Sequence, residues 1–218
     1  MVRPRGRPPG GGLAHSTEEL LDRALEAFAE RGYEGTSVRE LARDLGVSHN
    51  LIPQRLGSKE DLWFAAVDRG FGFLAVELTS VLVEVNDADD DLARLRALVR
   101  RFIEANARRP ALLQVISREA VSPGPRLDHI FDTFIAPVRD FGDDLLRRLR
   151  AEGKVRNDSV SILYFLMTHG GGGAAALPGL AARLGAPVDP SDDAAIRAHA
   201  AAVTEIIFDG LGVGRRDN

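Results

Sequence analysis

Side chains that form directional hydrogen bonds are concentrated near position 50 of this 218-residue chain. They carry hydroxyl, imidazole, amide and guanidinium groups, which together offer both donors and acceptors. The members are Ser48, His49, Asn50, Gln54 and Arg55. Groups of these types bind base edges and phosphates when a single helix presents them on one side.

Two short helices joined by a glycine are predicted to present these side chains. Ser37 and Glu40 form an S-x-x-E capping box at the start of the first helix. Gly46 supplies a left-handed stop, and Ser48 is predicted to cap the second helix. Apolar residues of the second helix face inward, so the polar group faces outward. This is the layout of a helix-turn-helix, whose second helix enters the DNA major groove. The alternative is an ordinary helical hairpin inside a core.

A further helix is predicted on each side of this pair. Ser16 and Glu19 form a second capping box, and the helix that follows ends before Gly32. Ser58 with Asp61 can cap a long helix that starts at residue 59. Three helices and the base of a fourth therefore make a small head with its own core.

The first residues form a basic arm. Proline and glycine are too dense in residues 1–15 for core packing, which predicts disorder. Residues 4–8, Pro-Arg-Gly-Arg-Pro, are similar to the core of an AT-hook, in which Arg5 and Arg7 would enter a narrow minor groove. The alternative is a flexible basic tail without base preference, which still attracts phosphates.

The head resembles the N-terminal domain of TetR-type transcriptional repressors over about residues 16–66. The shared motifs are FAERGYEGTSVRELA at residues 28–42, LGVS at 45–48 and GSKEDL at 57–62. The resemblance implies a DNA-binding head, with base or phosphate contacts from Thr36, Ser37, Ser48, His49, Asn50, Gln54, Arg55 and Lys59. Of these, Thr36 matches a phosphate contact at a helix start, and Lys59 matches a lysine that contacts the backbone across the groove.

Pro53 departs from the family pattern, which usually has an aromatic residue that touches a phosphate at this position. Proline cannot make that contact, and its nitrogen cannot bond to the carbonyl of His49. We therefore expect the recognition helix to be bent or to start late.

The body, residues 67–218, is predicted to be all helix, which makes the chain an all-α protein. A helix ends before Pro110, and a long apolar stripe runs through residues 131–149. The glycines at 170–173 lack the Lys-Ser/Thr of a P-loop, so close helix packing at a dimer seam, or a loop, is predicted instead.

The resemblance implies an effector pocket between helices of the body, for a small apolar or amphipathic molecule. Candidate lining residues are Phe102, Arg118, Phe131, Phe134, Tyr164, Met167 and His169. The alternative for each of them is plain core packing.

The last helix is apolar on more than one face, with alanines between larger residues. This pattern predicts helix-to-helix dimerisation through Ile196, Ala200, Val203, Ile207 and Leu211. The alternative is burial within the same chain. We favour the dimer because two-fold DNA sites require a two-fold protein.

Enzyme chemistry is not expected. The five histidines show no metal-ligand spacing, there is no cysteine, and there is no G-x-S-x-G motif. The acidic groups at 87–91 and 143–144 fit helix starts or solvated faces. We expect no cofactor and no metal. No apolar run could span a membrane and no signal peptide is evident, which predicts a cytoplasmic protein.

These patterns predict a homodimeric repressor that binds palindromic double-stranded DNA and is released by a small ligand. Residues 1–60 are electrically neutral, and the net charge of −4 comes from the remainder. Alternatives are an activator with the same head, or an effector-independent protein that coats A·T-rich DNA through the arm. An enzyme, or a binding module whose head has lost DNA, is the third possibility.

Overall fold

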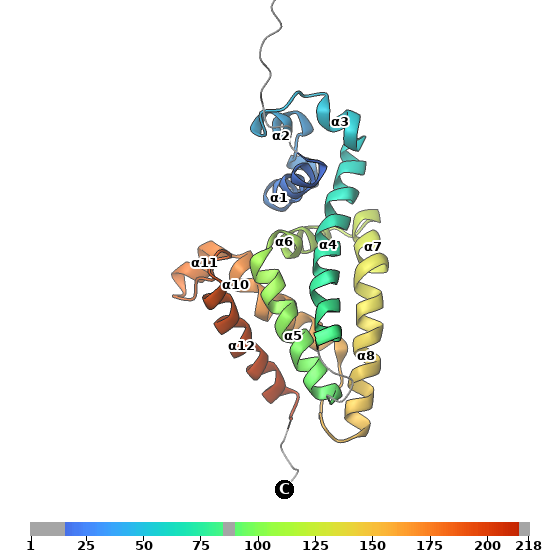
Figure 1. The fold of residues 1–218 in the computed structure, drawn as a ribbon, viewed down its shortest axis with the longest axis vertical. Helices are drawn as coiled ribbons and strands as arrows, with labels where there is room; N and C mark the ends of the chain where they lie inside the picture. The colour runs from blue at the N-terminus through green and yellow to red at the C-terminus, as the bar shows by residue number, and fades with distance from the viewer. Residues whose placement is uncertain (1–15, 85–89, 214–218) are drawn as a thin grey trace, which may run out of the picture. The chain divides into compact units, whose positions relative to one another are not determined.

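The structure is a computed structural model that describes residues 16–84 and 90–213. The predicted AT-hook residues Arg5 and Arg7 lie outside these ranges. Every regular element within them is a helix, as the sequence predicts (Figure 1). The chain divides into two compact units, residues 1–66 and 67–218. We call the first unit the head and the second the body.

The head is built from helices that share one small core. Leu20, Phe28, Leu41, Ile52 and Trp63 are each no more than 3% exposed. Burial of side chains of this size is the main stabilising term for such a unit. The helices are α1 (Thr17–Gly35), α2 (Val38–Asp44), α3 (Leu51–Leu56) and the first turns of α4 (Lys59–Glu84).

Local signals set the helix boundaries in the head. The capping box at α1 is present in both directions: Ser16 N donates to Glu19 Oε2 at 2.8 Å, and Glu19 N donates to Ser16 Oγ at 3.1 Å. Helical geometry in α1 is interrupted at Gly32, whose φ of 73° favours glycine. The predicted end of the first helix is therefore confirmed.

The start of α4 depends on Gly57. Ser58 N donates to Asp61 Oδ2 at 2.8 Å, and Asp61 N donates back to Ser58 Oγ at 3.1 Å. Hydrogen bonds from Ser58 hold the pKa of Asp61 below its usual value. Gly57 has a φ of 76°, and a Cβ added there would lie 2.5 Å from Asp61 Oδ2. Both the backbone conformation and the cap therefore require glycine at this position.

The body is a bundle arranged around one central helix. That helix is α5 (Asp91–Arg108), and α12 lies against it (Figure 1). Two π-helical turns, Phe131–Ile135 and Leu166–Gly171, interrupt the later helices. The other elements are α6 (Ala111–Val121), α7 (Pro125–Ile130), α8 (Ala136–Ala151), α9 (Val160–Phe165), α10 (Gly172–Ala176), α11 (Pro178–Arg183) and α12 (Asp193–Gly210).

The main core of the body joins α5 to α8 and α12. Val99 and Ile103 of α5 belong to one buried cluster with Leu145 and Leu149 of α8 and with Phe208 of α12. Asp90 caps α5 and also accepts a hydrogen bond from Lys154 Nζ at 2.6 Å. The acidic residues at the start of α5 are thus helix-start charges, as the sequence predicts.

The glycine run is helical rather than a loop, so that alternative is wrong. A Cβ on Gly171 would lie 2.7 Å from Ile103 Cγ1, and one on Gly172 would lie 2.7 Å from Leu113 Cδ2. The close packing that the sequence predicts is present, but it joins elements of one chain. His199 Nε2 also lies 2.8 Å from the carbonyl oxygen of Gly171, which adds a hydrogen bond at this contact.

Replacing Gly171 with alanine is expected to lower the free energy of unfolding by about 1–3 kcal/mol, because the methyl group would overlap Ile103 in a filled core. Gly170→Ala is the matched control, since no atom lies within 4 Å of a Cβ there. The control should leave stability unchanged or raise it by up to about 1 kcal/mol. Urea denaturation measures both variants, and equal losses would contradict the assigned contact.

Candidate functional site

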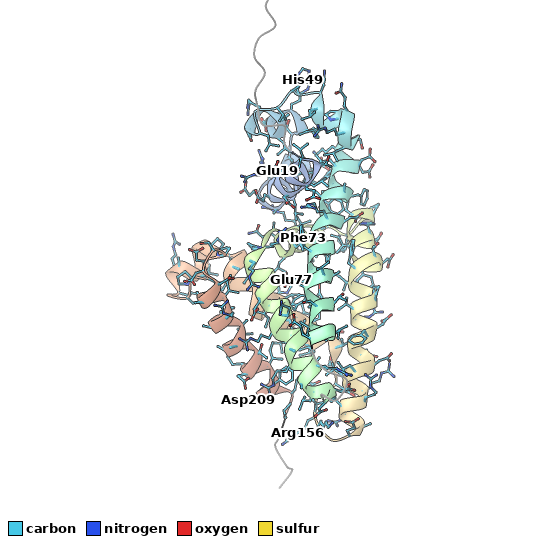
Figure 2. All side chains as sticks on the ribbon, in the orientation of Figure 1. Glu19, His49, Phe73, Glu77, Arg156 and Asp209 are labelled. Carbon is cyan, nitrogen blue, oxygen red and sulfur yellow. The ribbon has the colours of Figure 1, made fainter. Side chains whose placement is uncertain are left out.

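The polar group around position 50 forms an exposed edge on the head. Ser48, His49 and Asn50 lie in the turn before α3, and Gln54 and Arg55 lie on α3 itself; all five are exposed. Figure 2 shows His49 at the outer surface of the head. Ile52, on the opposite side of α3, is fully buried. The buried anchor and the exposed polar side chains have the arrangement that a recognition helix requires.

The recognition helix starts late, as expected from Pro53. It begins at Leu51, so Asn50 is the N-cap, and no side chain caps it. The prediction that Ser48 caps α3 is wrong, because Ser48 Oγ instead lies 3.5 Å from Asn50 N. Proline is tolerated at residue 53 because the first turn of a helix has no carbonyl partners for its nitrogens.

The Thr36 hydroxyl faces backbone carbonyls in this structure. Thr36 is 2% exposed, and its Oγ1 lies 2.7 Å from the carbonyl oxygen of Gly32 and 3.1 Å from that of Ala27. Ser37 is the N-cap of α2 and accepts a hydrogen bond from Glu40 N at 3.4 Å. The Thr36 side chain thus has a structural role at the end of α1, and its contact with a phosphate stays a prediction.

Lys59 is held by the link between α1 and α2. Its Nζ donates to the carbonyl oxygen of Glu34 at 3.4 Å and lies 4.5 Å from the centre of the Tyr33 ring. The ammonium group is half-buried at the first turn of α4. Its contact with DNA remains a prediction.

Two arginines on α2 were missed by the motif reading. Arg39 and Arg43 are exposed and lie on the helix that precedes the turn. Guanidinium groups beside a recognition helix bind phosphates and fix its orientation on the duplex. The sequence signal for these phosphate contacts was two basic residues on the polar side of the helix that precedes Gly46.

The body contains an apolar cavity of about 320 Å³ between α4, α5, α8 and α9. Phe102, Tyr164 and Met167 line it, as the resemblance implied. Val138 and Phe141 of α8 also line it and are about half exposed. The sequence predicts both residues as part of an apolar core stripe. A pattern of this kind cannot distinguish a buried core from the wall of an open cavity.

Four of the predicted ligand-binding residues do not line this cavity. Phe134 stacks on Phe71 with ring centres 4.4 Å apart, and Phe131 lies beneath the Arg139 guanidinium. His169 is exposed with Nδ1 2.9 Å from Thr168 Oγ1, and Arg118 is exposed on α6. The π-helical turn Phe131–Ile135 has a different helical period from α8. Phe131 and Phe134 therefore do not share the side of α8 that lines the cavity.

The predicted dimer residues lie mostly in the core of their own chain. Ile196, Ala200, Ile207 and Leu211 are each no more than 5% exposed, and Val203 is half-buried. They form the inner face of α12, which contacts α5. In this structure these side chains pack within their own chain, and their role in a dimer stays a prediction. The outer face of α12 presents Ile206, which is 72% exposed.

No group of three or more His, Asp or Glu side chains in the described ranges is placed to hold a metal ion. No helix in residues 16–84 or 90–213 has the length and apolar character needed to cross a bilayer.

Residues 20–66 match the family model described as "Bacterial regulatory proteins, tetR family". The repressor AcnR of Corynebacterium glutamicum is 43% identical over 51 residues, which covers 23% of this chain and 27% of AcnR. The chain thus spans about a quarter of the length of the curated relatives that it matches first. The head is therefore similar to the N-terminal domain of tetR-family regulators, in which the exposed edge around α3 corresponds to the helix-turn-helix.

Solved structures extend the likeness from the head to the whole fold. The ketosteroid transcriptional regulator KstR2 of Mycobacterium tuberculosis has a TM-score of 0.69 and 22% identity, covering 92% of this chain and 97% of KstR2. AibR, solved with isovaleryl coenzyme A and operator DNA, has a TM-score of 0.64 and 20% identity, covering 87% and 96%. The chain has the all-α fold of these regulators, with an N-terminal head and a helical body.

Arg55→Ala is expected to weaken binding to the preferred DNA sequence by about 1–3 kcal/mol, through loss of a base or phosphate contact. Stability should not change, because the residue is exposed. Arg23→Ala on α1 is the control, since it removes the same charge from an exposed site on another helix. Fluorescence anisotropy measures both variants. Equal losses would indicate that α3 contributes only net charge.

Proposed function

We propose that this protein is a homodimeric transcriptional repressor that binds a palindromic operator and is released by a small molecule. The observation that carries the proposal is the TetR-type head with an exposed polar edge on and before α3. Two such heads related by two-fold symmetry would reach successive major grooves about 34–36 Å apart. A protein that acts on bacterial genomic DNA works in the cytoplasm, where we place it.

The cavity supports the ligand-released form of this proposal. Its volume lies at the lower end of the range of about 300–1,000 Å³ for small-molecule sites. Helix α4 begins in the head at Lys59, and its residues 75–82 contribute to the cavity wall. A ligand that prefers one position of α4 would shift the population toward that conformation. DNA affinity would then fall by the ratio of the ligand's affinities for the two states.

Selection of bound sequences from a random DNA pool tests the regulator assignment directly. The expected product is an inverted repeat whose half-sites lie one helical turn apart. Recovery of sequences without a repeat, or of A·T-rich sequences at any spacing, would contradict a two-fold reader. A gel shift with the selected site, with and without candidate ligands, then tests release.

The dimer is expected to form through exposed apolar side chains of the last helices. Ile162, Phe165 and Leu166 are between 45% and 61% exposed, and they lie on α9 and the π-helical turn that follows. That turn contacts α12, which carries Ile206. Monomers seldom expose contiguous apolar surfaces of this kind, which favours a second copy of the chain as the partner.

The double variant Phe165→Glu/Ile206→Glu is expected to be monomeric and to lose operator binding, because burying uncompensated negative charges in an apolar interface is costly. Val121→Glu is the matched control, since Val121 is 85% exposed at the end of α6. Sedimentation velocity reports the oligomeric state. A variant that remains dimeric would show that the subunits meet elsewhere.

A further inference from the structure

The cavity in the body is apolar except for a few groups. Its polar lining residues are Thr79, Arg139 and Tyr164, and the others are aliphatic, aromatic, proline or glycine. Thr79 Oγ1 already donates to the carbonyl oxygen of Ala75 at 2.7 Å. Donation of a hydrogen bond to a ligand acceptor therefore falls to Tyr164 or Arg139.

Tyr164 presents a hydroxyl that makes no hydrogen bond within the described residues. Tyr164 is one of the residues that line the cavity, and burial raises the pKa of its phenol above the usual value. The group therefore stays protonated at neutral pH and can donate. Because this donor has no partner among the described residues, a ligand acceptor beside it would gain a hydrogen bond that a hydrocarbon cannot make.

Arg139 is already engaged by a carboxylate. Its Nε and Nη2 donate to Asp140 Oδ1 at 3.0 and 2.6 Å, and its side chain is 42% exposed. The positive charge at the opening is therefore balanced by the neighbouring residue. A ligand carboxylate inside the cavity would have no uncompensated cation among the lining residues, and burying it would cost more than its hydrogen bonds return.

The volume limits the size of the ligand. The cavity of about 320 Å³ lies at the lower end of the range of about 300–1,000 Å³ for small-molecule sites. A site of that size suits a medium-length alkyl chain, or a small ring system with one substituent, of about ten non-hydrogen atoms. A long-chain acid or a complete coenzyme A thioester is much larger.

We propose that the effector is a neutral organic molecule of about ten non-hydrogen atoms, with one carbonyl or hydroxyl group that accepts a hydrogen bond from Tyr164. The apolar part of the ligand fills the space beside Phe102 and Met167. This inference rests on the proposed role of the body as the effector-binding unit, and it specifies the chemical class that the body accepts.

Isothermal titration calorimetry of the full chain at neutral pH tests the class with two probes of equal chain length. Heptyl methyl ketone represents the neutral acceptor, and nonanoate represents the anion. The ketone is expected to bind at least tenfold more tightly. Equal affinities, tighter binding of nonanoate, or no binding of the ketone would overturn the proposal. This comparison uses the unmodified chain, so it does not depend on the folding of any variant.

Tyr164→Phe removes only the hydroxyl and is expected to weaken ketone binding by about three- to tenfold. Arg147→Gln is the control, since Arg147 is exposed on α8 and does not line the cavity, and it should leave ketone affinity unchanged. Full affinity in Tyr164→Phe, or an equal loss in both variants, would overturn the role assigned to Tyr164. Thermal unfolding of each variant verifies that the cavity is intact.

Calorimetry without DNA separates this inference from the proposed function. A chain that binds the ketone but selects no operator would retain the ligand class and lose the regulator assignment. A chain that selects an operator but binds no ketone would keep the regulator and reject the ligand class.

Discussion

The body depends on how closely α5 and α6 approach Gly171 and Gly172 at the start of α10. Ile103 of α5 occupies the volume that a side chain at Gly171 would need, and Leu113 does the same at Gly172. Packing at this distance leaves no room for adjustment, because protein interiors are filled to the density of organic crystals. The contact sets the spacing between α5 and the last helices. Residues of α5 line the cavity, and the inner face of α12 packs against α5, so both depend on that spacing.

The head combines burial of its small core with hydrogen bonds at helix ends. Ser16 and Ser58 start their helices through reciprocal bonds, and Thr36 joins two helices through its hydroxyl. Each bond of this kind contributes about 0.5–1.5 kcal/mol. A unit of this size has a small core, so these terms are a substantial part of its stability. Substitutions at the caps therefore affect DNA binding even where no DNA contact is lost.

Local signals in the sequence predicted the helices well. Capping serines, glycines with positive φ and prolines act within a few residues, so the boundaries of α1, α4 and α5 could be derived without tertiary information. The neighbours that each side chain faces in the folded chain were harder to derive. Thr36 has the residue type of a phosphate contact, but its hydroxyl meets carbonyl oxygens contributed by α1. Ile196 and Ile207 have the spacing of an interface and lie in the core, because one apolar stripe fits either partner. The cavity walls needed α4, α5, α8 and α9 together, which no single window of sequence contains.

The short recognition helix has a consequence for the thermodynamics of DNA binding. A six-residue helix is marginal in isolation, since nucleation costs more than a single turn returns. Pro53 fixes its own φ near the helical value, which reduces the number of conformations open to the free chain. Less backbone entropy is then lost when the exposed segment from Ser48 to Arg55 binds DNA. A proline in this helix thus makes the DNA-reading segment rigid before it meets its target.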